Sequence, residues 1–152
     1  MNMTKTVLTH STEETELIGS EFARELSLGD FVAMRGDLGV GKTAFVRGFT
    51  SHIAPSALVR SPTFALVNEY RAKPRSVFHF DMYRITDEDD LFSIGYYDYL
   101  NRPGICLVEW SENIPYALPE LYIRLTIEKS DPSQPELRTV VAEITDELPE
   151  EG

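Results

Sequence analysis

The sequence lacks several features that mark membrane proteins and secreted proteins. No apolar run approaches the roughly 20 residues that a bilayer-spanning helix needs, and no apolar signal-peptide stretch follows the first residues. The single cysteine, Cys106, cannot form a disulfide within the chain, which fits a reducing compartment. It lies in the apolar run 105–108, where we expect a buried, unreactive side chain rather than a catalytic thiol. These absences predict a cytoplasmic chain without a membrane anchor.

Positive charge is also scarce. The chain carries 14 lysine and arginine residues against 25 aspartate and glutamate residues, a formal net charge of −11. This balance disfavours direct, extended contact with the phosphate backbone of a nucleic acid. No internal repeat or low-complexity linker divides the sequence, so we expect a single domain over residues 1–145. Residues 146–152 are acidic and are expected to form a solvated tail, with docking to a partner as the alternative.

What the sequence does contain is a succession of short apolar or alternating segments, which predicts strands. The expected strands are residues 6–9, 31–34, 65–70, 77–80, 105–109, 121–127 and 139–144. The second and fifth of these segments are mostly apolar, as expected for buried parallel strands, whereas the last two alternate and suggest a hairpin.

Helical signals separate several of these strands. Ser11 and Glu14 have the spacing of a capping box, and an apolar stripe with four-residue spacing follows them. A second stripe covers residues 45–53, and a third, short helix is expected to turn Leu91 and Phe92 inward. Strand, loop and helix at the start, with antiparallel pairs later, predict a three-layer α/β fold with a mixed parallel and antiparallel sheet.

A glycine-rich motif stands between a predicted strand and a predicted helix. Residues 36–43 read Gly-Asp-Leu-Gly-Val-Gly-Lys-Thr and match the P-loop pattern G-x-x-x-x-G-K-[ST] in full. Glycines let successive backbone N–H groups face the phosphates of a nucleotide, and the start of the helix adds partial positive charge. Lys42 brings a full charge to the β- and γ-phosphates, and the Thr43 hydroxyl is a ligand for Mg²⁺. The motif therefore predicts a P-loop NTPase-like fold.

Two acidic residues end predicted strands, where ligands bind in open α/β sheets. Asp81 follows the strand 77–80, and Glu109 ends the strand 105–109. A P-loop needs a further carboxylate to hold the metal and arrange water. For each of the two residues, the pattern alone leaves open a metal role or an ordinary charge at a strand end.

Four segments occur in a recognisable order along the chain. They are Gly36–Thr43, Ser61-Pro62-Thr63-Phe64, His79-Phe80-Asp81-Met82-Tyr83-Arg84 and Val108-Glu109-Trp110. Together they closely resemble the bacterial TsaE family, also called YjeE or YdiB, of ATPases that serve threonylcarbamoyladenosine synthesis on tRNA. The resemblance covers about residues 11–140, and its one departure, Val40 in place of a frequent alanine, is conservative.

The resemblance implies roles for individual residues. Lys42, Asp81 and Glu109 would be catalytic, with Thr43 and Glu109 as ligands of Mg²⁺. The ATP would be bound by Thr12, Asp37, Leu38, Gly39, Val40, Gly41, Lys42, Thr43 and Ala44. A switch near the γ-phosphate or a contact with a partner would involve Thr63, Arg84 and Trp110.

Several of these residues also have purely structural explanations. Thr12 suits helix capping, Trp110 suits the core, and the segment 61–63 suits a turn. We place the His79 side chain apart from the site of Asp81 and interpret it as a structural histidine with satisfied hydrogen bonds. The three histidines of the sequence show no zinc-ligand spacing.

For function, the resemblance implies Mg²⁺-dependent hydrolysis of ATP during threonylcarbamoyladenosine (t6A) modification of tRNA. Hydrolysis would drive or reset a complex of two partner proteins, TsaB and TsaD, and tRNA would be contacted only indirectly. The isolated chain is expected to be a monomer. Its turnover alone is expected to be slow, because no arginine in the sequence stands out as an arginine finger. Two other classes stay open, a small-molecule kinase and a nucleotide-gated binding module. The absence of a basic lid segment speaks against the kinase.

Overall fold

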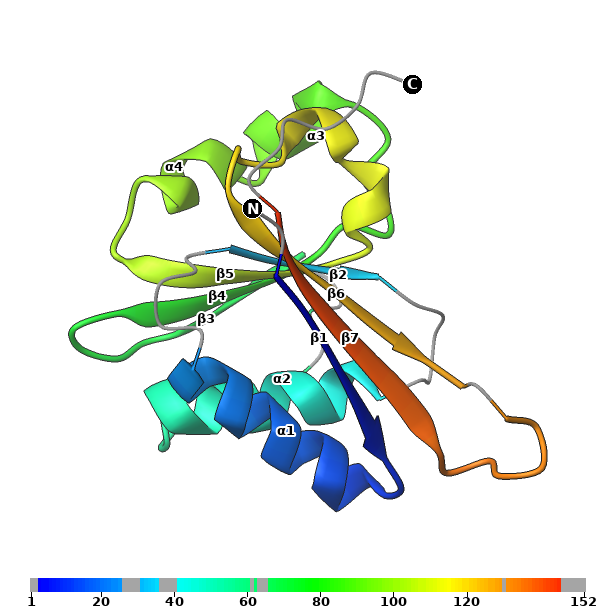
Figure 1. Cartoon of the computed structure of the whole chain (residues 1–152). Coiled ribbons are helices and arrows are strands. Elements are labelled where there is room, and N and C mark those ends of the chain that lie inside the picture. Colours follow the sequence, from blue (N-terminus) through cyan, green and yellow to red (C-terminus); the bar gives the residue numbers. More distant parts are fainter. Residues whose placement is uncertain are drawn as a thin grey trace.

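A seven-stranded sheet forms the centre of the molecule. The computed structural model describes residues 3–25, 31–35, 41–60, 62, 66–129 and 131–145. In this part of the chain the strand order is β1-β7-β6-β2-β5-β4-β3 (Figure 1). The strands are β1 Met3–Thr9, β2 Phe31–Arg35, β3 Val67–Tyr70, β4 Ser76–Asp81, β5 Gly104–Glu109, β6 Tyr122–Glu128 and β7 Arg138–Thr145. Every strand expected from the sequence is present, with shifts at some of the ends.

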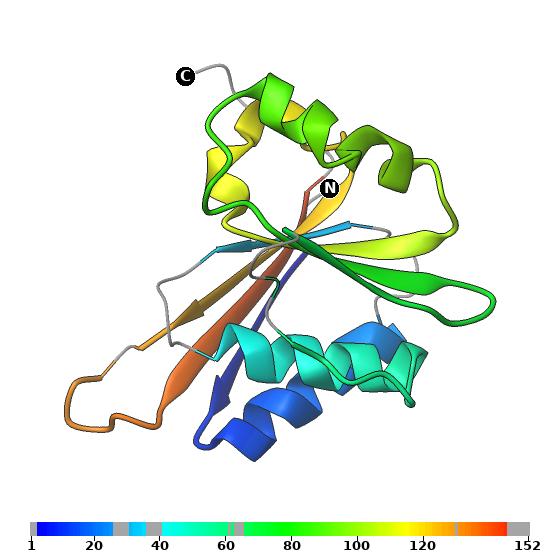
Figure 2. The same ribbon diagram turned by 180° about the vertical axis from the view of Figure 1, so that it is seen from behind.

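Helices cover both faces of the sheet and give the molecule three layers. They are α1 Thr12–Glu25, α2 Lys42–Ile53, α3 Glu88–Ser93 and α4 Tyr96–Leu100, with single 3-10 turns η1 Ser111–Asn113 and η2 Pro115–Ala117. Figures 1 and 2 show α1 and α2 side by side on one face of the sheet, with α3 and α4 on the other. The predicted three-layer α/β architecture is therefore confirmed.

The sheet mixes parallel and antiparallel pairs, as expected. Strand β2 lies between β5 and β6 and is parallel to both, and β4 extends the parallel set beside β5. Antiparallel pairs flank this centre, with β3 beside β4 at one edge and β6, β7 and β1 at the other. The expected final hairpin is confirmed, but its first strand begins at Tyr122 rather than at Leu121, which is 55% exposed.

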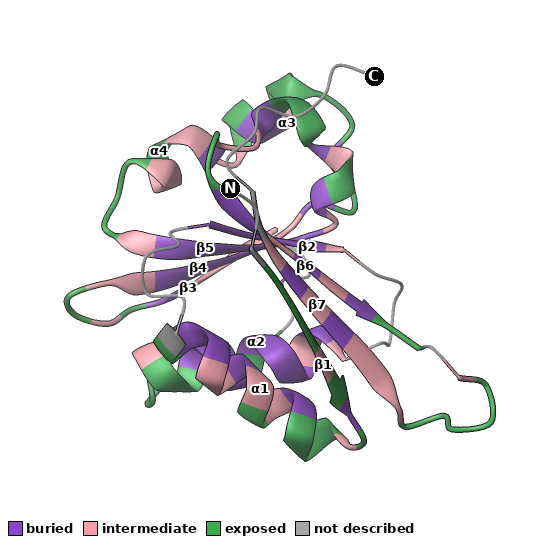
Figure 3. Cartoon of the chain, in the orientation of Figure 1, coloured by how far each residue is buried: buried purple, intermediate pink, exposed green. Residues whose placement is uncertain are grey.

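Alternation along the central strands separates two apolar cores, one on each face of the sheet (Figure 3). On β5, Ile105 and Leu107 pack in the core that includes residues of α1 and α2. Cys106 and Val108 pack in the opposite core, beneath α3 and α4, so the buried position expected for the cysteine is confirmed. Because side chains alternate along a strand, Glu109 lies on the face of Ile105 and Leu107 and projects toward α1 and α2.

Two glycines allow α1 and α2 to pack with their backbones close together. A Cβ atom placed on Gly48 would lie 1.7 Å from the carbonyl oxygen of Glu16, and one on Gly19 would lie 2.3 Å from that of Phe45. Both distances are far shorter than van der Waals contact, so any larger residue would force the two backbones apart. At Gly41, before α2, a Cβ would lie 3.6 Å from the Thr15 side chain of α1. The starts of both helices thus meet at one edge of the sheet.

The predicted start of α1 is confirmed by its hydrogen bonds. The Ser11 hydroxyl accepts the backbone N–H of Glu14 at 3.0 Å. In return, the Glu14 carboxylate accepts the backbone N–H of His10 at 2.6 Å. This is a capping box in which the carboxylate reaches the residue before the cap, and it fixes where the chain leaves β1 and enters the helix.

The expectation for α3 is right for one residue and wrong for the next. Leu91 is fully buried, but Phe92 is 63% exposed instead of facing inward. The helix spans only six residues, so a single narrow side packs against the sheet, and the residue after Leu91 is turned about 100° away from it. The Phe92 ring rests on Tyr97 of α4, with ring centroids 5.1 Å apart.

Some expectations fall outside the part of the chain that the structure describes. The acidic segment 146–152 is one of them, and the domain boundary at residue 145 therefore stays a prediction. Among the described helices, none combines the length and the apolar character needed to cross a bilayer.

Candidate functional site

The carboxyl ends of β4 and β5 bring two acidic residues together. Asp81 ends β4, Glu109 ends β5, and the parallel register makes them direct partners. Met34 of β2 is the register partner of Glu109 on its other side. Both carboxylates therefore lie side by side at the edge of the sheet where ligands bind in open α/β folds.

A cavity of about 610 Å³ opens at this edge. Its described walls come from the starts of α1 and α2, the ends of β4 and β5, and the segment that leads into β7. Among the residues predicted from the sequence, those that line it are Thr12, Gly41, Lys42, Thr43, Ala44, Asp81, Glu109 and Trp110. Pockets of roughly 300–1,000 Å³ typically hold small ligands and cofactors, so the volume suits a nucleotide.

The start of α2 presents positive charge to the cavity. Gly41 precedes the helix with φ 105°, a left-handed conformation that other residues rarely adopt. The first N–H groups of a helix have no partner within the helix and carry partial positive charge. Lys42 is only 5% exposed, and its Nζ lies 4.7 Å from the centroid of the Trp110 ring. This concentration of donors and charge is what a phosphate group requires.

Trp110 belongs to the core and to the site at once. The half-buried indole packs against the apolar core beneath α3 and α4, and it also lines the cavity. Its backbone is left-handed, with φ 59°, which costs a non-glycine residue about 1–2 kcal/mol. The turn comes directly after β5, and it sets the indole between Lys42 and the Tyr83 ring, whose centroid is 5.0 Å away.

The pKa of the Asp81 carboxyl is raised above its ordinary value. The main cause is burial, which disfavours the charged form, and the negative charge of Glu109 acts in the same direction. The Tyr83 N–H, 2.9 Å from Oδ1, and the positive charge of Lys42 oppose the shift. A cation between the two carboxylates would relieve their repulsion.

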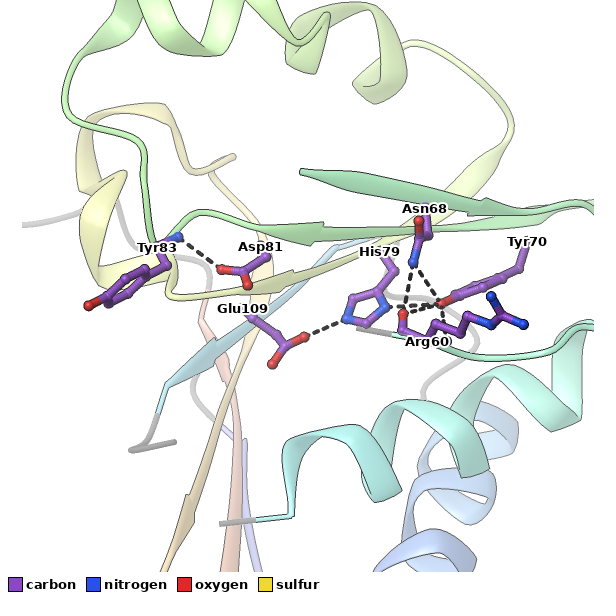
Figure 4. Close-up of polar contacts among 7 residues, drawn as sticks. All are labelled: Arg60, Asn68, Tyr70, His79, Asp81, Tyr83 and Glu109. Atoms are coloured by element: carbon purple, nitrogen blue, oxygen red, sulfur yellow. Dashed lines mark hydrogen bonds and ion pairs between the residues drawn. The ribbon is translucent and has the colours of Figure 1, made fainter. Parts of the chain in front are cut away.

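His79, expected apart from the site, touches it directly. Its Nε2 lies 2.6 Å from Oε2 of Glu109, and its Nδ1 lies 3.2 Å from the Tyr70 hydroxyl (Figure 4). The ring is fully buried, so the interpretation as a structural histidine with satisfied hydrogen bonds is confirmed. The prediction that His79 lies apart from the site of Asp81 is wrong. Residues two apart on a strand share a face, so His79 and Asp81 point to the same side of the sheet. The strand register then sets Asp81 opposite Glu109, which His79 contacts.

Thr12 is the first residue of α1 and lies in the wall of the cavity. The capping hydroxyl comes from Ser11, so Thr12 is not itself the side chain that caps the helix. Thr15, one turn further on, also lines the cavity, and its hydroxyl lies 2.7 Å from that of Thr9. Contact between Thr12 and a nucleotide stays a prediction.

Other predicted site residues lie elsewhere or outside the described segments. Arg84 is exposed and does not belong to the described lining of the cavity, so its part in a switch or partner contact stays a prediction. The residues outside the described segments are Asp37, Leu38, Gly39, Val40 and Thr63. Pro62, which precedes Thr63, is buried and lines the cavity.

Several residues that line the cavity are absent from the prediction, among them Thr15, Arg47, Pro135, Glu136 and Arg138. Arg47 lies one helical turn after Thr43, so the four-residue spacing of helix neighbours is a signal that points to it. Glu136, just before β7, and Arg138, the first residue of β7, also line the cavity. No local pattern indicates these two, because only the antiparallel return of β7 along β6 carries them to the site.

The donor set suits a Mg²⁺ ion that is bound together with phosphate. Thr43 offers a hydroxyl, and Asp81 and Glu109 offer carboxylate oxygens, which are the hard ligands that Mg²⁺ prefers. Within the described segments, no three His, Cys, Asp or Glu side chains gather to hold a metal by themselves. Mg²⁺ commonly combines one or two carboxylates with substrate phosphates and water, so the residues present fit it.

Comparison with known protein families gives one match over most of the chain. The family model described as "Threonylcarbamoyl adenosine biosynthesis protein TsaE" matches residues 9–139. The tRNA threonylcarbamoyladenosine biosynthesis protein TsaE of Haemophilus influenzae is 43% identical over 100 residues, which cover 66% of this chain and 63% of that protein, less than two thirds of its length. The protein of the same name from Bacillus subtilis is 34% identical over 125 residues, covering 82% and 78%.

A solved structure shares the fold. The crystal structure of YdiB from Bacillus subtilis matches with a TM-score of 0.73 and 27% identity. The match covers 95% of this chain and 88% of that one. The prediction of a P-loop NTPase-like fold with a mixed sheet is therefore confirmed.

Proposed function

The chain belongs to the TsaE family, which takes part in threonylcarbamoyladenosine biosynthesis on tRNA, and from this premise we propose that it is a Mg²⁺-dependent ATPase. One observation carries the proposal. Lys42 at the start of α2 and the register pair of Asp81 and Glu109 border the same cavity. Transfer of a phosphoryl group needs this combination of a phosphate-binding lysine and metal-directed carboxylates.

Each of these residues has a role in the proposed reaction. Lys42 and the N–H groups at the start of α2 bind the β- and γ-phosphates of ATP. Thr43 and Glu109 would hold Mg²⁺, which would neutralise charge on the phosphate oxygens. Asp81 orients a water molecule toward the γ-phosphorus. The water oxygen bonds to phosphorus as the bond to the β–γ bridging oxygen breaks, and ADP and phosphate leave while the proton of the water passes to phosphate or solvent.

The proposal extends to partners. TsaB and TsaD form the complex that hydrolysis drives or resets between rounds of tRNA modification. The net charge of −11 supports action on proteins, with tRNA held mainly by the partners in the cytoplasm. The isolated chain is a monomer. It turns over slowly, because no arginine in the sequence stands out as an arginine finger.

The test is phosphate release from ATP and Mg²⁺, measured for the isolated chain and for the chain with TsaB and TsaD. We expect slow release alone and faster release with both partners. Transfer of the γ-phosphate to a metabolite would instead identify a small-molecule kinase. Binding of ATP with no release in either case would leave a nucleotide-gated binding module.

A further inference from the structure

A line of hydrogen bonds, buried at Glu109, His79 and Tyr70 and partly exposed at Arg60, runs from Glu109 away from the cavity (Figure 4). Oε2 of Glu109 lies 2.6 Å from His79 Nε2, and His79 Nδ1 lies 3.2 Å from the Tyr70 hydroxyl. That hydroxyl lies 2.8 Å from the carbonyl oxygen of Arg60 and accepts the Arg60 N–H at 3.1 Å. The line connects β5, β4 and β3 to the backbone that precedes β3, and the proposed reaction assigns no role to it.

The chemistry of the ring gives the line a direction. An ionised carboxylate only accepts hydrogen bonds, so the N–H at Nε2 of His79 donates a hydrogen bond to Glu109. On its other side, Nδ1 lies beside the Tyr70 hydroxyl, whose single proton serves either the Arg60 carbonyl oxygen or Nδ1. The bond occupies one carboxylate oxygen of Glu109, and Figure 4 shows the other turned away from the ring. His79 thereby fixes which oxygen of Glu109 is left for a ligand.

Burial makes this arrangement rigid. His79 is 0% exposed and Tyr70 is 6% exposed, so water does not offer these two groups alternative partners. A buried donor or acceptor that loses its partner keeps the full cost of its desolvation, which holds each member of the line in place. At the far end, the Asn68 amide donates to the Arg60 carbonyl oxygen at 2.8 Å and anchors the same backbone.

We propose that His79 is a positioning residue that orients the Glu109 carboxylate and, through Tyr70, couples the nucleotide site to the backbone at Arg60. The proposal rests on the proposed function, since it requires Mg²⁺ and ATP beside Glu109. Arg60 directly precedes Ser61 in the sequence, and Pro62 of that segment lines the cavity. Occupancy of the site and the order of the backbone at Arg60 then stabilise each other, because coupling between two sites is reciprocal.

The first test separates positioning from a purely structural role by measuring ATP binding with Mg²⁺ and with EDTA. The probe is a fluorescent ATP analogue, and the variants are His79→Leu and His79→Gln. Loss of a residue that orients a metal ligand typically weakens metal binding roughly 10- to 100-fold. We expect His79→Leu to weaken binding about tenfold in Mg²⁺ and less than about twofold in EDTA.

His79→Gln provides the conservative control, because it keeps a side-chain N–H that can donate a hydrogen bond to Glu109. We expect this variant to recover Mg²⁺-dependent affinity to within about threefold of the wild type. A folded His79→Leu protein that keeps the wild-type affinity in Mg²⁺, or that loses affinity equally in Mg²⁺ and EDTA, overturns the proposal. If His79→Leu does not fold, the same comparison is made with His79→Phe, which retains a buried ring but lacks the nitrogen that contacts Glu109.

The second test follows the coupling itself through hydrogen exchange of the Arg60 amide. In the wild type, Mg²⁺ and ATP are expected to slow this exchange several-fold. In Tyr70→Phe the nucleotide should still bind, but the slowing at Arg60 should disappear. Tyr97→Phe is the matched control, since its hydroxyl donates to Glu88 at 3.2 Å outside the line of hydrogen bonds. Equal slowing in Tyr70→Phe and Tyr97→Phe overturns the coupling.

The wild type distinguishes failure of this inference from failure of the proposed function. If the wild type binds no ATP in Mg²⁺, the ATPase proposal is wrong and the role of His79 is wrong with it. If the wild type binds ATP and the His79 and Tyr70 variants behave like it, only the positioning role is wrong.

Discussion

The face of the sheet that carries α1 and α2 differs in chemistry from the face that carries α3 and α4. On the first face, the apolar core runs into a polar edge, where Lys42 and Glu109 are buried beside Asp81. On the second face, aromatic rings pack against one another, as Phe80 and Tyr96 do with ring centroids 5.6 Å apart. One face therefore concentrates charge at a cavity, and the other concentrates apolar contact.

This difference separates two physical tasks. Charges held away from water cost free energy unless they are paired, so the first face gives up some stability to keep a lysine and two carboxylates ready for a ligand. Apolar burial on the second face stabilises the sheet without any charge to satisfy. We expect substitutions at the cavity to change ATP binding more than stability, and substitutions beneath α3 and α4 to do the reverse.

The largest effect is expected for Lys42→Ala. Loss of the charged contact to the phosphates should weaken ATP binding by about 100-fold or more, as expected for charge-assisted hydrogen bonds. The free energy of unfolding should change by less than about 1 kcal/mol, since a buried positive charge is removed along with its contacts. Calorimetric ATP titration and urea unfolding measure the two quantities.

Lys73→Ala is the matched control for this variant, because Lys73 is an exposed lysine in the turn between β3 and β4. It should bind ATP like the wild type. If Lys42→Ala also bound ATP with wild-type affinity, Lys42 would not belong to the proposed site. The expected difference between the two faces of the sheet would then be wrong.

Gly48→Ala tests whether the functional face also contributes to stability. The new methyl group would meet the Glu16 backbone of α1 at 1.7 Å, so the helices must move apart. We expect a loss of about 2 kcal/mol or more in the free energy of unfolding, within the range for overpacked positions. The exposed neighbour variant His52→Ala should change it by less than about 0.5 kcal/mol. Urea unfolding measures the stability of both variants. If Gly48→Ala were as stable as His52→Ala, α1 and α2 would tolerate a larger distance between their backbones.

Tyr96→Phe probes the opposite face with a single atom. The Tyr96 hydroxyl donates to the carbonyl oxygen of Ala117 at 2.8 Å, and its removal leaves that buried carbonyl without this partner. We expect a loss of about 1–2 kcal/mol in unfolding free energy and no change in ATP affinity. The matched variant Tyr97→Phe removes a more exposed hydroxyl and should cost less. A clear loss of ATP affinity in Tyr96→Phe would contradict the expectation that the face of α3 and α4 contributes stability and not ATP binding.

The smallest effect is expected for Asp81→Asn without nucleotide. Burial and Glu109 raise the pKa of Asp81 above its ordinary value of 3.8, so the unfolded chain loses this proton at lower pH than the folded chain. As the pH rises from the ordinary pKa through the raised pKa of the folded state, ionisation of Asp81 therefore lowers the free energy of unfolding. At neutral pH, Asp81→Asn should raise the unfolding free energy by less than about 1 kcal/mol, because solvent screens the partly exposed group.

This difference should vanish below the ordinary pKa, where Asp81 is protonated in both states. Thermal unfolding at several pH values, without Mg²⁺ and nucleotide, measures it. A variant that is less stable than the wild type at neutral pH would show that the hydrogen bond from Tyr83 outweighs burial and repulsion at this position.

Much of the site could be predicted because its signals are local. The P-loop motif specifies Lys42 and Thr43 through a continuous stretch of chain, and the apolar run of β5 marks Glu109 as a strand end. His79 could not be assigned to the site in this way. Its contact with Glu109 depends on the register between β4 and β5, which no single segment encodes.

The sequence by itself determined the succession of strands and helices, the capping box at Ser11, the lysine at the start of α2 and the two carboxylates at strand ends. These features depend on periodicity and on the conformational preferences of neighbouring residues. Only the tertiary structure decided that Asp81 lies opposite Glu109, that His79 holds Glu109, and that Phe92 points outward. The physical reason is that strand register and helix orientation are fixed by packing between residues far apart in the chain.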